Sequence, residues 1–227
     1  MTSAIELLPW TAGFREYASA EQLASELARA VAGEICSAVS ARGVCHMVVP
    51  GGSSPQAFFL QLVGHELPWH RLHLYPSDER CVPVGDRERN DRMIDEILLS
   101  RANMPSENLH RIPAELGPEA GARCYAQTLQ SVPVFDVAVL GVGSDGHIAS
   151  LFPGHSALHD GRDAVPVAGA PKLPPSRVSV GLRRLRAAGS RHVIALGAEK
   201  RAVFSPATRL VTSPVLQFDG NIWCAWV

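Results

Sequence analysis

The residues best suited to chemistry lie in one short glycine-rich stretch past the middle of the chain. The segment GVGSDGH (141–147) fits the pattern G-x-G-x-x-G and places Asp145 two residues before His147. A histidine can take a proton from water near neutral pH, and a nearby aspartate can orient the ring or the water. This spacing favours a catalytic base in a loop. The alternatives are a dinucleotide-binding loop and a histidine that only caps the start of a helix.

The dinucleotide alternative is the weaker one. Such a loop needs an N-terminal βαβ unit and an acidic residue roughly 20 positions further on. Here Asp160 and Asp163 follow too early, and no clear strand ends at them. The glycines are better explained by a sharp turn after a buried strand, and Gly146 is expected to leave room for substrate beside His147. The chain has no G-x-S-x-G elbow, so a water activated by histidine is favoured over a serine nucleophile.

The segment PGGSSP (50–55) has the composition of a phosphate-binding loop. Adjacent glycines allow close backbone approach, and the helix predicted to follow offers free N–H groups to an anion. The candidate residues are Gly51, Gly52, Ser53 and Ser54. The segment is not a Walker A loop, because no Gly-Lys-Ser/Thr follows. A tight turn with Ser54 as the helix N-cap is an equally supported alternative.

Three further segments place charged side chains where they can meet an anion. Asp78, Glu79 and Arg80 directly follow a predicted buried strand, where charges cost free energy unless they pair or meet a ligand. Arg80 can hold an anion in fork geometry, with Asp78 or Glu79 fixing its direction; a plain surface turn is the alternative. Arg177 and Lys200 can each bind phosphate, although each alone is more often a surface residue.

These loops must be positioned by the elements between them, and the hydrophobic pattern predicts an α/β fold. Helices are expected over 19–43, 55–64, 90–103 and 117–132, and strands over 44–49, 72–75, 135–143, 177–181, 192–197 and 221–227. Strands that alternate with helices indicate a parallel sheet covered on both faces, and ligands bind such sheets at the carboxyl ends of the strands. The Pro- and Ala-rich segment 165–177 is predicted to be a loop.

Composition excludes several classes of function. The formal net charge of −1 gives no basic field for nucleic acid or an anionic membrane. No apolar run approaches membrane-spanning length, and the N-terminal residues do not have the pattern of a secretory signal. Five cysteines without a C-x-x-C pair favour neither a disulfide framework nor a metal site. The default expectation is a cytoplasmic protein.

In order and spacing, these loops resemble those of the 6-phosphogluconolactonase family, which shares a superfamily with the glucosamine-6-phosphate deaminases. The resemblance covers nearly the whole chain, and its specific part is the combination of DER with GxGxDGHxASLFPG. The matching segments are VVPGGSSPQAFFLQL, YPSDERCVPV, FDVAVLGVGSDGHIASLFPG, RVSVG, GAEK and SPATRL. The resemblance implies one domain over residues 1–227, folded as a modified Rossmann-like, three-layer parallel-sheet sandwich of the sugar-phosphate isomerase/deaminase type.

The resemblance also implies an activity: hydrolysis of 6-phosphogluconolactone to 6-phosphogluconate in the oxidative pentose phosphate pathway, without metal or organic cofactor. His147 matches the general base, beside Asp145. The residues that match positions gathering the phosphate and the substrate oxygens are Gly51, Gly52, Ser53, Ser54, Asp78, Arg80, Arg177 and Lys200. Which cation touches phosphate and which faces the lactone carbonyl stays open. The expected partner is a small sugar phosphate lactone, and the protein itself is expected to be a monomer or homodimer.

Departures from the family pattern define the alternatives. Ile148 stands where the lactonases usually have threonine, and Arg89-Asn90 replaces a Ser-Asn pair. Ile148 is the residue of the amino-sugar phosphate deaminases, but those enzymes have tyrosine at the position of Arg80 and an assisting glutamate at the position of Phe152. Losing that carboxylate favours lactone hydrolysis. A non-catalytic sugar-phosphate sensor is a second alternative, and the presence of His147 argues against it.

Overall fold

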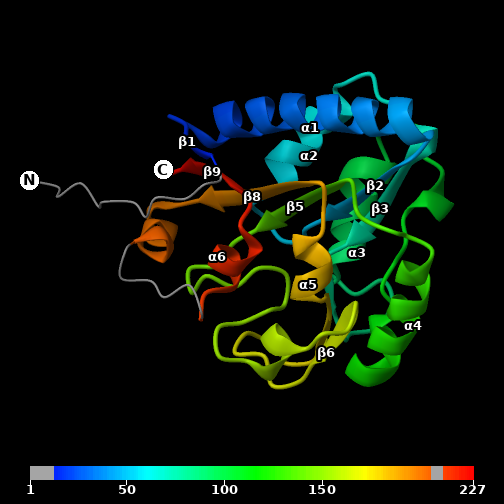
Figure 1. The fold of residues 1–227 in the computed structure, drawn as a ribbon, viewed down its shortest axis with the longest axis vertical. Helices are drawn as coiled ribbons and strands as arrows, with labels where there is room; N and C mark the ends of the chain where they lie inside the picture. Colours follow the sequence, from blue (N-terminus) through cyan, green and yellow to red (C-terminus); the bar gives the residue numbers. More distant parts are fainter. Residues whose placement is uncertain (1–12, 206–211) are drawn as a thin grey trace, which may run out of the picture.

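The computed structural model describes residues 13–205 and 212–227 (Figure 1). At its centre lies a six-stranded parallel sheet with the order β1-β9-β8-β5-β2-β3. Its strands are β1 Phe14–Glu16, β2 Cys45–Val49, β3 Leu72–Pro76, β5 Val137–Gly141, β8 Ser190–Leu196 and β9 Asn221–Ala225. The predicted α/β fold with a parallel sheet is therefore confirmed. The SPATRL segment of the sequence analysis lies, except for its first residue, outside the described residues.

The long first helix shows why the local sequence folds as it does. α1 spans Ala20–Arg42. The Ser19 hydroxyl accepts a hydrogen bond from Gln22 N at 3.2 Å, which satisfies one free N–H of the first turn. Gly43 ends the helix with φ 77°, a conformation that glycine adopts without steric cost. Apolar side chains at helical spacing are buried against the sheet, as predicted: Leu23, Leu27, Val31 and Ile35.

Helices cover both faces of the sheet and form two cores. The α-helices after α1 are α2 Gln56–Val63, α3 Asn90–Ile94, α4 Pro118–Gln130, α5 Leu182–Arg186 and α6 Pro214–Phe218. α3 continues as a π-helical turn over Asp95–Leu99, and short 3₁₀ helices span Trp69–Arg71, Ser106–Asn108, Ala114–Leu116, Ser156–His159 and Ala198–Phe204. One core packs α1 to α3 on one face, and the other packs α4 to α6 on the opposite face (Figure 1). Within the described residues, no helix combines the length and hydropathy needed to cross a bilayer.

A second, antiparallel sheet was not predicted. It joins β4 Asp78–Arg80, β7 Arg177–Val180 and β6 Ala164–Val167 in the order β4-β7-β6. The prediction of a loop over 165–177 was wrong at its start, and 78–80 is a strand rather than a turn. β4 and β6 are too short to show an alternating pattern of apolar residues. Pro166 also argued against a strand, but β6 tolerates it because β6 lies at the edge of the sheet. β7 was expected in the parallel sheet but pairs here instead.

Candidate active site

A cleft of about 350 Å³ lies where the predicted loops meet, beyond the carboxyl ends of β2, β3, β5 and β8. Its walls include nine of the ten residues proposed from the sequence: Gly51, Gly52, Ser53, Ser54, Asp78, Arg80, His147, Arg177 and Lys200. The tenth, Asp145, lies behind His147. Pro50, Ser77, Asn90, Lys172 and Glu199 also line the cleft and were not predicted to belong to it.

His147 and Asp145 form a hydrogen-bonded pair. The Nδ1 atom of His147 lies 2.5 Å from Oδ1 of Asp145, and the same carboxylate oxygen accepts the backbone N–H of His147 at 3.3 Å. Burial alone would raise the pKa of Asp145, but the hydrogen bond with His147 and the charge of that ring lower it to about 2. The carboxylate is therefore ionised and orients the ring. Because Nδ1 is engaged, Nε2 is the ring nitrogen that can accept a proton.

Phe152 supports the other side of this ring. Its centroid lies 4.6 Å from that of His147, and the Phe152 side chain is fully buried. The imidazole is thus held between a carboxylate and an aromatic ring, with only 15% of the side chain exposed. Such a fixed ring suits general-base catalysis, which depends on orientation.

The glycines of this loop have separate roles. Gly146 has φ 86°, and a Cβ there would point at Ser213 and Val203, 3.2 Å away, rather than into the cleft. The expectation that Gly146 leaves room for substrate was therefore wrong. Gly143 instead leaves room for the imidazole of His147, because a Cβ on it would lie 2.1 Å from Nδ1 and Cε1 of that ring. The loop closes by a hydrogen bond from Gly143 N to His147 O at 2.9 Å.

The strand β4 places alternate side chains in different surroundings. Asp78 and Arg80 line the cleft, while Glu79 between them is fully buried. Glu79 accepts the backbone N–H groups of Arg80, Asn90 and Asp91 at 2.8–2.9 Å and so caps the start of α3. Burial raises the pKa of Glu79 to about 7, although these three N–H groups oppose the rise. The buried carboxyl therefore joins β4 to the helix that follows.

Asn90 is brought into the cleft by this cap. Its Nδ2 donates to the carbonyl oxygen of Asp78 at 2.8 Å. Its Oδ1 atom would lie 1.9 Å from a Cβ on Gly51, so only glycine fits at that position of the first loop. The close approach of Asn90 to Gly51 thus ties α3 to the loop that follows β2.

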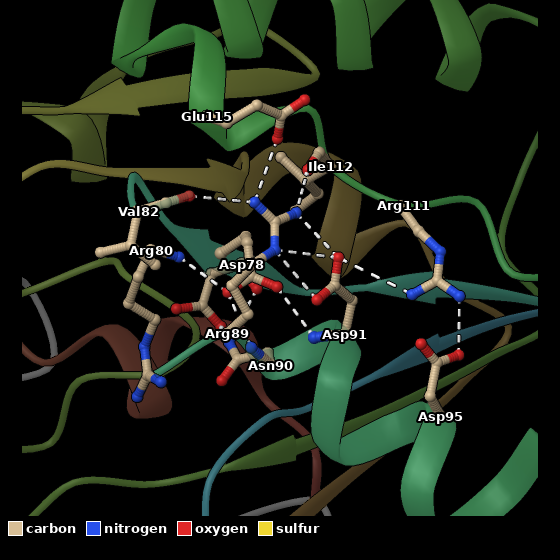
Figure 2. A network of polar contacts seen from close by, with 11 residues as sticks. Asp78, Arg80, Val82, Arg89, Asn90, Asp91, Asp95, Arg111, Ile112 and Glu115 are labelled. Carbon is tan, nitrogen blue, oxygen red and sulfur yellow. Dashed lines mark hydrogen bonds and ion pairs between the residues drawn. The ribbon is translucent and has the colours of Figure 1, made fainter. Parts of the chain in front are cut away.

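Arg89 faces away from the cleft (Figure 2). Its guanidinium donates to Asp91 at 2.7 Å, to Glu115 at 3.0 Å and to the carbonyl oxygen of Ile112 at 3.0 Å. Only 2% of its side chain is exposed. Figure 2 also shows Arg80 extending away from this network. The replacement of the expected Ser-Asn pair by Arg89-Asn90 therefore adds a buried ion-pair network and leaves the asparagine in the cleft.

The cations of the cleft are held in different ways. Lys200 Nζ donates to Ser54 Oγ at 3.3 Å, and burial lowers the pKa of Lys200. This contact uses the Ser54 hydroxyl, and the N-cap of α2 is Pro55 rather than Ser54. Arg80 Nη1 donates to the carbonyl oxygen of Glu88, and its Nε is buried with no hydrogen-bond partner among the described residues.

The cleft is more positive than the chain as a whole. Arg80, Lys172, Arg177 and Lys200 face two carboxylates, those of Asp78 and Glu199, whereas the complete chain has a formal charge of −1. A fixed histidine beside such a cluster suits an anionic substrate that water can attack.

Comparison with known proteins gives consistent similarities. The family described as glucosamine-6-phosphate isomerases/6-phosphogluconolactonase matches residues 18–219. The GDH/6PGL endoplasmic bifunctional protein of Homo sapiens is 34% identical over 205 residues, 86% of this chain, and the chain spans only 26% of that protein. The 6-phosphogluconolactonase of Streptomyces coelicolor is 36% identical over 199 residues, covering 79% of this chain and 76% of the relative. A 6-phosphogluconolactonase structure from Shewanella baltica superposes with a TM-score of 0.83 at 26% identity, covering 97% of this chain and 99% of that one.

Proposed function

The chain belongs to the family of glucosamine-6-phosphate isomerases and 6-phosphogluconolactonases, and we propose that it hydrolyses 6-phospho-D-glucono-1,5-lactone to 6-phosphogluconate. The observation that carries this proposal is the His147 ring, held by the Asp145 carboxylate on one side and by Phe152 on the other, inside a cationic cleft. The proposed reaction needs a base and an anion-binding site, and both are supplied by residues of one cleft.

In the proposed mechanism, Nε2 of His147 takes a proton from water while the water oxygen attacks the lactone carbonyl carbon. The carbonyl oxygen becomes an oxyanion in the tetrahedral intermediate, and a fixed cation beside it lowers the barrier. The intermediate then collapses, the bond to the ring oxygen breaks, and the imidazolium returns its proton to that oxygen. Asp145 stabilises the imidazolium between the two transfers, because it accepts from Nδ1.

We assign the oxyanion to Arg80 and the phosphoryl group to the loop after β2. Arg80 lines the same cleft as His147, and its Nε has no partner among the described residues, so protein acceptors do not saturate its guanidinium. Lys200 instead contacts Ser54, beside the glycines that allow a phosphate to approach the backbone. The ends of the substrate are thus separated in the cleft, with His147 facing the reacting carbonyl.

The rival activity within the family is amino-sugar phosphate deamination. It calls for a carboxylate that assists the histidine during ring opening, and Phe152 occupies that position. Phe152 is buried and packs on the imidazole, so no acidic side chain takes its place there. This packing favours lactone hydrolysis. A sugar-phosphate sensor without activity would have no need of the oriented His147–Asp145 pair.

We also propose a cytoplasmic location and a monomeric or homodimeric state. All five cysteines are free thiols, which is typical of a reducing compartment. The net charge of −1 supports a protein that acts on small molecules rather than on nucleic acid.

The decisive test is a coupled assay. Lactone generated enzymatically is mixed with the protein, and 6-phosphogluconate is followed through its dehydrogenase against the spontaneous hydrolysis rate. We expect strong acceleration without added metal, and little hydrolysis of unphosphorylated gluconolactone. Release of ammonia from glucosamine 6-phosphate, without lactonase activity, would instead support the deaminase alternative. Tight binding of 6-phosphogluconate with neither activity would support the sensor.

A further inference from the structure

The distribution of lysine in this chain is unusual. Of its 21 lysine and arginine residues, only Lys172 and Lys200 are lysines, and both line the cleft. Lysine offers a compact charge on a flexible stem, whereas arginine offers a planar fork. The chain thus uses arginine for every other basic side chain and places ammonium groups only here. Lys200 already has a proposed role at the phosphoryl group, whereas Lys172 has none.

Lys172 lies in the loop between β6 and β7, and Arg177 holds that loop in place. The Arg177 guanidinium donates from Nη2 to the carbonyl oxygens of Lys172 at 3.1 Å and Leu173 at 2.9 Å, and from Nε to that of Pro174 at 3.0 Å. Arg177 is only 5% exposed. Three consecutive carbonyl groups are therefore gathered by one side chain.

The remaining side of Arg177 is also engaged. Its Nη1 approaches Ser150 Oγ at 3.5 Å, and that hydroxyl donates to Asp78 Oδ2 at 2.6 Å. Because Nε, Nη1 and Nη2 are all directed at protein oxygens, few N–H donors of the guanidinium remain to bind a phosphate. Arg177 is thus suited to supporting the loop, although the sequence predicted that it would bind the substrate.

Lys172 and Lys200 line the same cleft, so their charges influence neighbouring groups there. Burial is the main cause of the lowered pKa of Lys200; the carboxylate of Glu199 opposes this effect, and the charge of Lys172 adds to it. The charge of Lys172 also contributes to lowering the pKa of Asp145, after the larger effects of burial and His147. Lys172 therefore lines the same cleft as Lys200 and His147, and its charge reaches both Lys200 and Asp145. Two ammonium groups that line one cleft and repel one another are suited to a doubly charged phosphoryl group bound beside both.

We propose that Lys172 is a second lysine ligand of the substrate's phosphoryl group, opposite Lys200, and that Arg177 is a positioning residue that holds the backbone of 172–174 so that Lys172 reaches it. This inference rests on the proposed function for the identity of the substrate. The pairing of the two lysines across one anion is a claim about binding, so it can be tested with or without turnover.

The first test uses steady-state kinetics of the lactonase reaction. Lys172→Met should raise KM about ten-fold or more with kcat within about three-fold, because the phosphoryl group is bound alike in the ground and transition states. Lys172→Arg should recover most of the loss. A fall in kcat with unchanged KM would place Lys172 at the reacting carbonyl and overturn the phosphoryl assignment.

A double-mutant cycle tests the positioning role. Arg177→Met should raise KM to a similar extent, and the double variant Lys172→Met/Arg177→Met should be no worse than the poorer single variant. If the KM increases of the two single variants multiply in the double variant, Arg177 binds the anion itself, and the positioning role is overturned. Arg177→Lys keeps the buried charge if Arg177→Met fails to fold. It should still raise KM, since the three donors of an ammonium share one nitrogen and cannot span the carbonyls that the guanidinium reaches from Nε and Nη2. Full recovery by this variant would equally overturn the role.

The second test observes the lysines directly. Reductive methylation with ¹³C-formaldehyde labels the two lysines and the α-amino group, and Lys172→Arg and Lys200→Arg variants assign the signals. Inorganic phosphate and 6-phosphogluconate should each shift both lysine signals, and for each ligand the two signals should give the same Kd. Gluconate should shift neither signal. A Lys172 signal that stays fixed while that of Lys200 moves would overturn the inference even if the lactone is hydrolysed. Shifts of both signals without hydrolysis would uphold this inference while the proposed function fails.

Discussion

Gly143→Ala is expected to disable the catalytic loop while leaving the fold intact. A Cβ on Gly143 would lie 2.1 Å from Nδ1 and Cε1 of His147 and 2.6 Å from Oδ1 of Asp145, whereas Cβ contacts below 3.0 Å essentially never occur. The imidazole must therefore move by about 0.9 Å or leave its rotamer. Gly143 is not among the residues with positive φ, so alanine introduces no backbone strain.

The displacement is large enough to be decisive for catalysis. A misplacement of about 1 Å costs roughly 10²-fold in rate, so kcat should fall by about that factor. The coupled dehydrogenase assay measures this, and 6-phosphogluconate binding by calorimetry should change little. The matched control is Gly33→Ala in the exposed middle of α1, where a Cβ meets nothing within 4 Å. It should leave kcat unchanged and stabilise the helix by about 0.5–1 kcal/mol. A Gly143→Ala protein with kcat within three-fold of the parent would refute the claim that the ring must stay where it lies.

Four further outcomes are expected. His147→Ala should lower kcat by roughly 10²–10⁴-fold in the same assay while calorimetry still detects 6-phosphogluconate, because only the base is lost. Lys200→Ala should raise KM more than it lowers kcat in steady-state assays, since phosphate is bound alike before and during reaction. Arg89→Met should lower the free energy of unfolding in urea by about 3–5 kcal/mol, because it leaves buried Asp91 with only a long contact to Arg111 at 3.8 Å; Arg92→Met, which breaks an exposed pair, should cost under about 1 kcal/mol. Burial, together with the charges of His73 and His46, lowers the pKa of His110 to about 4, so the folded state binds fewer protons and stability falls as pH drops from about 6.5 to 4. His110→Gln should remove roughly 1–2 kcal/mol of that fall between pH 7 and pH 5 in urea titrations.

Local signals in the sequence were enough to predict the parallel sheet and most of the cleft. The cap at Ser19 and the helical period of the α1 side chains depend on contacts within a few residues, so the helix expected over 19–43 is found. The loops that meet at the cleft follow strands whose apolar runs are unmistakable, so the gathering of His147, Arg80 and Lys200 could be deduced from topology.

What could not be predicted depends on contacts between distant segments. β4 and β7 are three and four residues long, and their pairing joins positions 78 and 179. The role of Glu79 as a helix cap needs α3 to begin beside it in space, twelve residues later. Lys172 lies in a Pro-rich segment without periodicity, and the hydrogen bonds of Arg177 that hold this segment at the cleft have no signal in the sequence.

The register of the small sheet also couples the stability of the fold to anion binding. Arg80 and Arg177 are direct cross-strand neighbours, and like charges in that arrangement oppose folding. An anion that binds between the surrounding cations relieves this repulsion only in the folded state. At a ligand concentration of 100 Kd, such linkage adds about 2.7 kcal/mol to stability. Because proteases cut transiently open molecules, we expect the ligand-free protein to be cleaved faster than the protein with an anion bound.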